Sequence, residues 1–294
     1  MVQGELKNNL LYGNVALLAA FCWGLSSVLI KIALDSFSPM YVMAFRFTLA
    51  AFCFLLFFHK RIKANLPNIK WKPCILIGLF LGIMNITVHY SLNLTGATTA
   101  TFFFSIPAIF TPFIGYLLYK YPFRAGHLFI VGLVVVGLYM LCITENGFSF
   151  GWGEFLGAVS SLTFAIAMVL QNQYLPQMDD ITVAALQITI VALCGWVVVL
   201  PTEGLMSLSG IPFEAWLIIG FLGIFGAFVT SICQNVSINH INADFVSVIL
   251  AAEPVFTAVI AYFVLDEKLT AAAVCGAVII MFCVVVTTLR GSKA

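Results

Sequence analysis

Residues 110–116 read Phe110-Thr111-Pro112-Phe113-Ile114-Gly115-Tyr116, and residues 256–262 read Phe256-Thr257-Ala258-Val259-Ile260-Ala261-Tyr262. The two stretches share Phe, Thr, Ile and Tyr at the same spacing and lie 146 positions apart, as the numbers 110 and 256 show. The same offset aligns residues 91–125 with residues 237–271. We interpret this match as an internal duplication. Duplication is typical of membrane transporters, in which two related halves rock about a central site.

The composition indicates that most of the chain faces lipid. Of its 294 residues, 62% are hydrophobic and only 9% are charged, whereas a soluble domain carries about 25% charged residues. A chain in contact with hydrocarbon must satisfy its backbone polar groups internally, which favours helices. The sequence therefore predicts an all-α integral membrane protein. The net charge of +1 gives no reason to expect a nucleic-acid partner.

Apolar runs long enough to cross a bilayer recur along the whole chain. A hydrocarbon core of about 30 Å needs about 20 residues of helix. Polar breaks divide the chain into ten predicted spans, at residues 12–34, 39–58, 73–93, 97–119, 126–143, 153–174, 181–201, 214–236, 244–264 and 270–289.

Basic residues gather on one side of the predicted membrane. On the other side, the only basic residues are Lys31, which lies near the end of a span, and Lys268, which lies in a loop. Because basic loops stay in the cytoplasm, we expect both termini to be cytoplasmic in a multi-pass protein of the cell membrane. The residues on the basic side are Lys7, Lys60, Arg61, Lys63, Lys70, Lys72, Lys120, Arg124, Arg290 and Lys293.

An odd number of spans in each half reverses the second half relative to the first. The loop charges agree, since the acidic residues Glu203, Glu214, Asp266 and Glu267 occur in second-half loops whose first-half counterparts are basic. We predict two inverted five-helix repeats around a central cavity. Residues 1–143 form the first repeat, residues 144–152 an external linker and residues 153–294 the second repeat.

The end of the second half carries a recognisable family pattern. The segment from Glu253-Pro254 to Asp266-Glu267-Lys268-Leu269-Thr270, together with Trp23-Gly24 and Phe45-Arg46-Phe47, resembles the EamA domain. Such domains build the ten-helix members of the drug/metabolite transporter superfamily. The resemblance covers nearly the whole chain as two EamA units and implies carriage of a small metabolite across a membrane. One departure from duplication is that Glu253 aligns with Pro107.

Polar side chains form a matched stripe in two related spans. Asn85 and His89 lie four residues apart on one helix face, and the 146-residue offset places Ser231 and Asn235 at the equivalent positions. Polar groups inside a membrane span usually face a cavity or the bundle interior. We therefore predict that all four bind substrate. The alternative is interhelical hydrogen bonding that only holds the bundle together.

Glu253 lies near the middle of a predicted span, directly before Pro254. One interpretation is that Glu253 contacts substrate or exchanges a proton in each transport cycle. The other is a structural or gating ion pair with Arg46. Among the aromatic residues, Trp23 is the best candidate for the site, followed by Phe102 and Phe164. Such a lining suits apolar, aromatic or cationic substrates.

The favoured function is a secondary transporter that moves a small organic metabolite by alternating access, most simply an amino acid or a related amine or aromatic compound. Proton coupling and exchange both stay open. The alternatives are an intramembrane enzyme or a lipid or drug exporter. The sequence has no phosphate-binding loop, no His-Glu-x-x-His motif and no Cys-x-x-Cys pair. We therefore expect no enzyme activity, cofactor or metal, and a monomer or weak dimer.

Overall fold

The computed structural model describes residues 2–122, 125–142, 151–207 and 209–290, and these residues are helical outside short turns and loops. In the first half the helices are α1 (Val2–Ala33), α2 (Pro39–Asn65), η1 (Leu66–Asn68), α3 (Trp71–Leu94), α4 (Ala97–Phe104), α5 (Pro107–Tyr119) and α6 (Ala125–Cys142). In the second half they are α7 (Trp152–Tyr174), η2 (Leu175–Gln177), α8 (Asp180–Thr202), α9 (Phe213–Gly223), η3 (Ile224–Val229), α10 (Thr230–His240), α11 (Ala243–Leu250), α12 (Glu253–Val264) and α13 (Ala271–Arg290).

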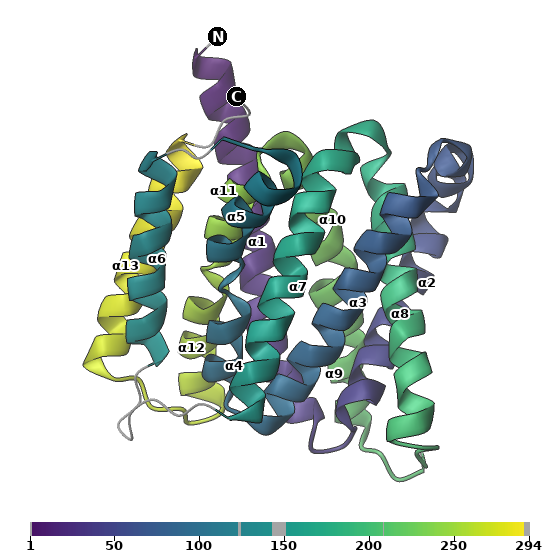
Figure 1. Ribbon diagram of the computed structural model, residues 1–294. Helices are drawn as coiled ribbons and strands as arrows, with labels where there is room; N and C mark the ends of the chain where they lie inside the picture. The colour runs from purple at the N-terminus through teal and green to yellow at the C-terminus, as the bar shows by residue number, and fades with distance from the viewer. Residues whose placement is uncertain (1, 123–124, 143–150, 208, 291–294) are drawn as a thin grey trace.

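These elements confirm the predicted all-α membrane fold. Within the described residues, 9 helical segments are long and apolar enough to cross a bilayer, and the shorter apolar helix Leu128–Leu141 completes the predicted set of ten. Helix α1 runs away from the end of the molecule where both termini lie, whereas its counterpart α7 runs toward that end (Figure 1). The two five-helix repeats are therefore inverted. Of the expected linker 144–152, all but Gly151 and Trp152 lies outside the described residues.

Helices of the two halves pack against one another through most of the bundle. Helix α3 packs along α7, α2 along α8, and α6 along α13 (Figure 1). The last pair approaches closely because each helix presents a glycine. A Cβ atom at Gly276 would collide with the carbonyl oxygen of Gly137, so a larger residue there would force α6 and α13 apart. Small residues at such contacts are typical of membrane helices.

Two predicted continuous spans are broken at equivalent places. The span 97–119 is interrupted at Ser105-Ile106, between α4 and α5, and the span 244–264 at Ala251-Ala252, between α11 and α12. The next helix has proline in its first turn in both cases, at Pro107 and Pro254. Proline has no N–H and clashes with the preceding turn, so it begins a helix more easily than it continues one. The two breaks lie next to the centre of the bundle.

A third irregularity lies within the predicted span 214–236, where residues Ile224–Val229 form the π-helical segment η3. A π-helical turn often marks a functional region because it widens the helix and shifts the face that its residues present. Gly226, within this segment, lies so close to α1 that a Cβ atom would collide with the Ser26 hydroxyl. Helix α1 and segment η3 therefore approach each other at a cavity that Ser26 and Gly226 both line.

Candidate functional site

A cavity lies between the two repeats. Its walls come from α1, α2 and α3 of the first half and from α8, η3, α10 and α12 of the second, with Phe104 from α4. Its volume is about 70 Å³, which is below the range of about 300–1,000 Å³ that is typical of sites for drug-sized ligands. Seven of the sequence-predicted site residues line this cavity: Trp23, Arg46, Asn85, His89, Ser231, Asn235 and Glu253.

The polar residues of α3 point toward the cavity but also bond within their own helix. Asn85 Nδ2 donates to the Leu81 carbonyl at 2.9 Å, and His89 Nδ1 lies 2.6 Å from the Asn85 carbonyl. A carbonyl oxygen can only accept, so Nδ1 must carry the proton of this hydrogen bond. In the neutral ring, Nε2 then offers a lone pair. His89 is fully buried, and its Nε2 has no hydrogen-bond partner.

On the second-half side, Asn235 belongs to a network of buried amides. Gln171 Nε2 donates to Asn235 Oδ1 at 2.9 Å and to Gln187 Oε1 at 3.2 Å, and Gln234 Nε2 donates to Gln171 Oε1 at 2.9 Å. Asn235 Nδ2 also donates to Gln187 Oε1, at 3.3 Å. The network joins α7, α8 and α10. Asn235 therefore both holds the bundle and lines the cavity. Ser231 lines it too and donates to the Phe228 carbonyl.

Arg46 and Glu253 do not form the direct ion pair that one interpretation of the sequence expected. Glu253 is only 3% exposed, and its carboxylate instead accepts a hydrogen bond from the Ser27 hydroxyl at 3.4 Å. Arg46, 5% exposed, lies with Cζ 4.5 Å from the centre of the Phe47 ring, while its Nε and Nη1 have no hydrogen-bond partner. Both residues line the cavity without being paired to each other.

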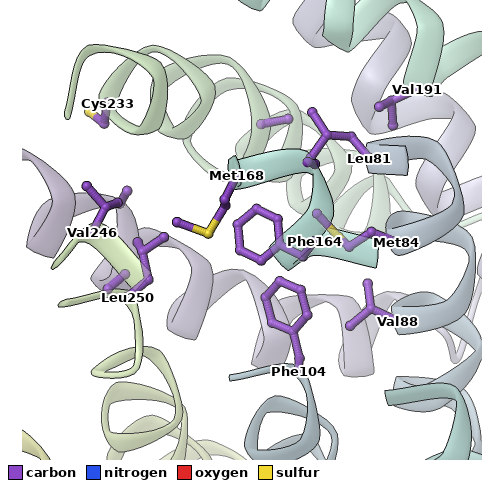
Figure 2. Packing of buried hydrophobic residues seen from close by; sticks show 14 of the residues in the cluster. Leu81, Met84, Val88, Phe104, Phe164, Met168, Val191, Cys233, Val246 and Leu250 are labelled. Carbon is purple, nitrogen blue, oxygen red and sulfur yellow. The ribbon is translucent and has the colours of Figure 1, made fainter. Parts of the chain in front are cut away.

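The aromatic wall contains Trp23, Phe104 and Phe164. The rings of Phe104 and Phe164 stack with their centroids 5.3 Å apart (Figure 2). The Trp23 ring meets both of these rings edge-on. Phe164 lies behind the main cavity, in a small adjoining pocket that Phe104 and Glu253 also border. The phenylalanine on α4 that reaches the cavity is Phe104, not the expected Phe102, which packs against Phe103.

Known proteins share both the sequence pattern and the fold. The model of the EamA-like transporter family matches residues 12–143 and again residues 151–289. The chain belongs to the EamA-like transporter family. A relative from Archaeoglobus fulgidus, named "Uncharacterized transporter", is 30% identical over 95% of this chain and 87% of its own length. A second relative of that name and organism is 26% identical over 88% of this chain and 92% of its own.

The fold of this EamA protein also matches a solved crystal structure. The TM-score is 0.78 at 15% sequence identity, and the match covers 96% of this chain and 97% of the other. At that identity the likeness concerns the fold alone. Family and relatives together show that the chain is a multi-pass membrane transporter and not an enzyme. In the part of the EamA chain that the structure describes, no group of His, Cys, Asp and Glu side chains could hold a metal ion.

Several cavity residues of this EamA protein escaped the sequence analysis. Gln234 aligns with the apolar Val88 at the 146-residue offset, Gln187 lies in a span for which no aligned partner was considered, and Ser26 and Ser27 are common helix residues with no distinguishing spacing. One sequence signal marks them: glutamine is costly in a membrane span, so Gln171, Gln187 and Gln234 are candidates for the bundle interior on the same ground as Asn235. Their meeting depends on how α7, α8 and α10 are rotated, which no single span reveals.

Proposed function

We propose that this EamA-family protein is a secondary transporter that moves a small organic metabolite across the cytoplasmic membrane by alternating access. The observation that carries the proposal is the central cavity between inverted repeats, whose lining includes the buried ionisable residues Arg46, His89 and Glu253. Buried polar atoms without partners, such as Arg46 Nε and His89 Nε2, are costly in a static scaffold, and binding of a polar ligand would offset that cost. Broken helices beside the site are typical of transporters.

The substrate class that the lining favours is an amino acid, or a related amine or aromatic compound. Trp23 and Phe104 supply an aromatic surface, while Arg46 and Glu253 supply opposite charges at the same cavity. A lipid or drug exporter is the alternative. Long apolar substrates would leave both charges without partners, so the polar lining favours the smaller, charged compounds.

The proposal also includes the orientation of the termini relative to the membrane and the residue ranges of the two repeats. The start of α1 and the turn that holds Lys70 lie at the same end of the molecule (Figure 1). The concentration of basic residues there supports a cytoplasmic location for both termini. We keep residues 1–143 and 153–294 as the two repeats. A monomer or weak dimer suits a site contained within one chain.

Glu253 is the candidate for proton coupling. It begins α12 at the break, is buried, and shares the cavity with Arg46 and His89, the two other ionisable groups of the lining. If a proton is carried on this carboxylate, Glu253→Gln should abolish uptake driven by a pH gradient in proteoliposomes. Glu214→Gln, which changes an exposed acid at the start of α9, is the matched control. Unchanged gradient dependence in Glu253→Gln would leave exchange as the mechanism.

The proposed function is tested by flux. Purified protein is first screened by thermal shift against amino acids, amines, nucleosides and sugar phosphates, since a ligand that binds the folded state raises the melting temperature. A stabilising compound is then radiolabelled and followed into proteoliposomes. Saturable exchange that needs the same compound on both sides supports a transporter. Ion conductance without saturation, or no flux for any stabilising compound, would overturn the proposal.

A further inference from the structure

Another cavity lies apart from the central one, at the end of the second repeat. It runs between α12 on one side and the α6–α13 pair on the other, and its volume is about 310 Å³. Val255 and Ala258 of α12 and Ala273 and Ala277 of α13 are among the residues that line it. Every described residue of the lining is aliphatic or a methionine. We call this cavity the α12–α13 groove.

The groove exists because α12 and α13 pack against different neighbours. Helix α12 packs along α1 and α4, whereas α13 packs along α6 and also contacts α1 and α11. Figure 1 shows α6 and α13 as a pair at the side of the bundle. Gly137 and Gly276 bring this pair into close contact. The groove therefore cannot close unless α13 leaves α6 or the pair shifts against α1 and α11.

The groove opens on a surface that faces hydrocarbon. Val274 and Val278 line it and are 52% and 64% exposed, within the membrane-length helix Ala271–Leu289. The lining extends from Leu269, just before α13, to Met281, halfway along that helix. Helix α13 begins at the end of the molecule opposite both termini (Figure 1). The groove is therefore open to the acyl chains of the membrane leaflet on that side.

The groove is wide enough for one extended alkyl chain and too narrow for a helix. From Ala273 to Met281 the α13 backbone rises about 12 Å, at about 1.5 Å per residue. A volume of about 310 Å³ over that length gives a mean cross-section of about 26 Å², or a width of about 6 Å. A helix with its side chains is about 10–12 Å across. A helix from a second copy of the chain would therefore not fit.

An empty groove of this kind is unfavourable. Its aliphatic side chains offer no hydrogen bond to water, and apolar cavities of this kind stay dry. Without an occupant, the wall atoms would lack dispersion contacts on one side. A flexible alkyl chain from the surrounding membrane supplies these contacts without burying a polar group.

We propose that the α12–α13 groove is a lipid site that holds one acyl chain of a phospholipid from the leaflet opposite the termini. The chain lies along α13 and packs against Val255, Ala258 and Val259 of α12. Helix α12 begins with Glu253, which lines the central cavity. The bound chain therefore supports the membrane face of the same helix that borders the central cavity. The lipid binds there whichever compound the protein carries.

Photocrosslinking in proteoliposomes tests this site. The unmodified full-length protein is reconstituted in phosphatidylcholine that contains a minor fraction with a diazirine midway along one acyl chain, and mass spectrometry locates the crosslinks. We expect several-fold more label on residues 255–259 and 273–281 than on Leu193, Val197 and Leu200. These three reference residues are exposed aliphatic side chains of α8 in the same half of the membrane. Equal labelling of the two surfaces would indicate annular lipid only and overturn the proposal.

Two matched variants test whether the label depends on the groove. Ala277→Phe places an aromatic ring in the groove, whereas Cys275→Phe adds the same ring at an exposed position of α13. We expect the excess label on residues 255–259 to be lost in Ala277→Phe and kept in Cys275→Phe. Where Ala277→Phe gives no folded protein by size exclusion, Val278→Phe, at the exposed mouth of the groove, replaces it. Excess label that persists in the folded variant would overturn the proposal.

Melting curves give a readout that needs no crosslinking. A phospholipid that binds the folded protein raises its melting temperature. Added phosphatidylcholine should therefore raise the melting temperature of detergent-purified Cys275→Phe more than that of Ala277→Phe. Equal rises in the two variants would show that the lipid acts elsewhere on the surface and would contradict the proposal. Neither measurement requires flux, so failure of the lipid site is distinguishable from failure of the transport function.

Discussion

Two turns occupy equivalent places in the inverted repeats but are held by different chemistry. The turn at residues 95–96 joins α3 to α4, and the turn at residues 241–242 joins α10 to α11 at the opposite end of the molecule (Figure 1). The two are 146 positions apart, which is the offset of the duplication. We call them the first turn and the second turn.

Charged side chains hold the first turn. Lys31 Nζ donates to the carbonyls of Leu92 and Thr95, each at 2.8 Å, and so satisfies the end of α3. Glu267 accepts from the Ala97 N–H at 3.0 Å and from the Thr98 hydroxyl at 2.5 Å, at the start of α4. Each charge has the sign that its helix end favours.

At the second turn, the acceptor at the start of α11 is a neutral amide, and the acid Asp244 lies in the first turn of that helix. The Ala243 N–H at the start of α11 donates to Asn172 Oδ1 at 3.2 Å. Tyr121, which the duplication aligns with Glu267, donates to Gln173 Oε1 at 2.6 Å. Charge-assisted hydrogen bonds are about twice as strong as neutral ones. We therefore expect loss of the acceptor at the start of α4 to cost more stability than loss of the acceptor at the start of α11, and the following substitutions measure that difference.

The largest effect is expected for Glu267→Ala. The substitution leaves the N–H of Ala97 and the Thr98 hydroxyl without their acceptor and removes a favourable charge at the start of α4. We expect a loss of about 2 kcal/mol in the free energy of unfolding, measured by denaturant titration in detergent micelles. Glu214→Ala, an exposed acid in the first turn of α9, is the control and should change stability little. Equal effects of the two substitutions would remove the capping role.

Lys31→Met keeps most of the side-chain volume and removes the ammonium group. The carbonyls of Leu92 and Thr95 then lose their donor, so we expect a loss of about 1.5 kcal/mol. Lys72→Met, at an exposed lysine in α3, serves as the control. If Lys31 merely extends toward water, as its place near a helix end would also allow, the two variants will melt at the same temperature.

Asn172→Ala tests the second turn directly. It removes one neutral acceptor from the Ala243 N–H, and the expected loss is about 1 kcal/mol. The prediction concerns the ranking: Asn172→Ala should destabilise less than Glu267→Ala in the same assay. The reverse order would contradict the difference inferred between the turns.

The smallest effect concerns Asp179, which lies between η2 and α8. Partial burial acts to raise the pKa of Asp179, but hydrogen bonds from Arg61 and Thr182 outweigh it and hold that pKa below its ordinary value. The stabilising contribution is therefore complete above about pH 5 and is lost as pH falls through the lowered pKa. Because Arg61 is half exposed, we expect less than about 1 kcal/mol.

Asp179→Asn retains an acceptor for the Thr182 N–H and removes the charge. Its stability should fall less steeply than that of the unmodified protein between about pH 5 and pH 3, as followed by melting temperature. Identical pH profiles would show that the Arg61 pair contributes nothing measurable.

The sequence predicted some parts of the site better than others. The structure places seven of the residues that the sequence singles out on the lining of one cavity: Trp23, Arg46, Asn85, His89, Ser231, Asn235 and Glu253. Phe104 was not chosen over Phe102, because the choice depends on the phase of α4, which ends just before Ser105. A continuous helix through Pro107 would have placed these rings differently. The capping role of Glu267 was also missed, since it reaches across to the other repeat.

The sequence by itself determined the membrane-spanning helices, their inverted arrangement and the family, because hydropathy, loop charge and short motifs are properties of local segments. Only the tertiary structure decided that Arg46 and Glu253 line one cavity without pairing and that Asn235 forms a hydrogen-bond network with three glutamines. It also decided that Lys31 and Glu267 bind the two helix ends at the first turn. The physical reason is that these contacts depend on helix rotation and on the breaks at Pro107 and Pro254. Both are set by packing between segments far apart in the chain.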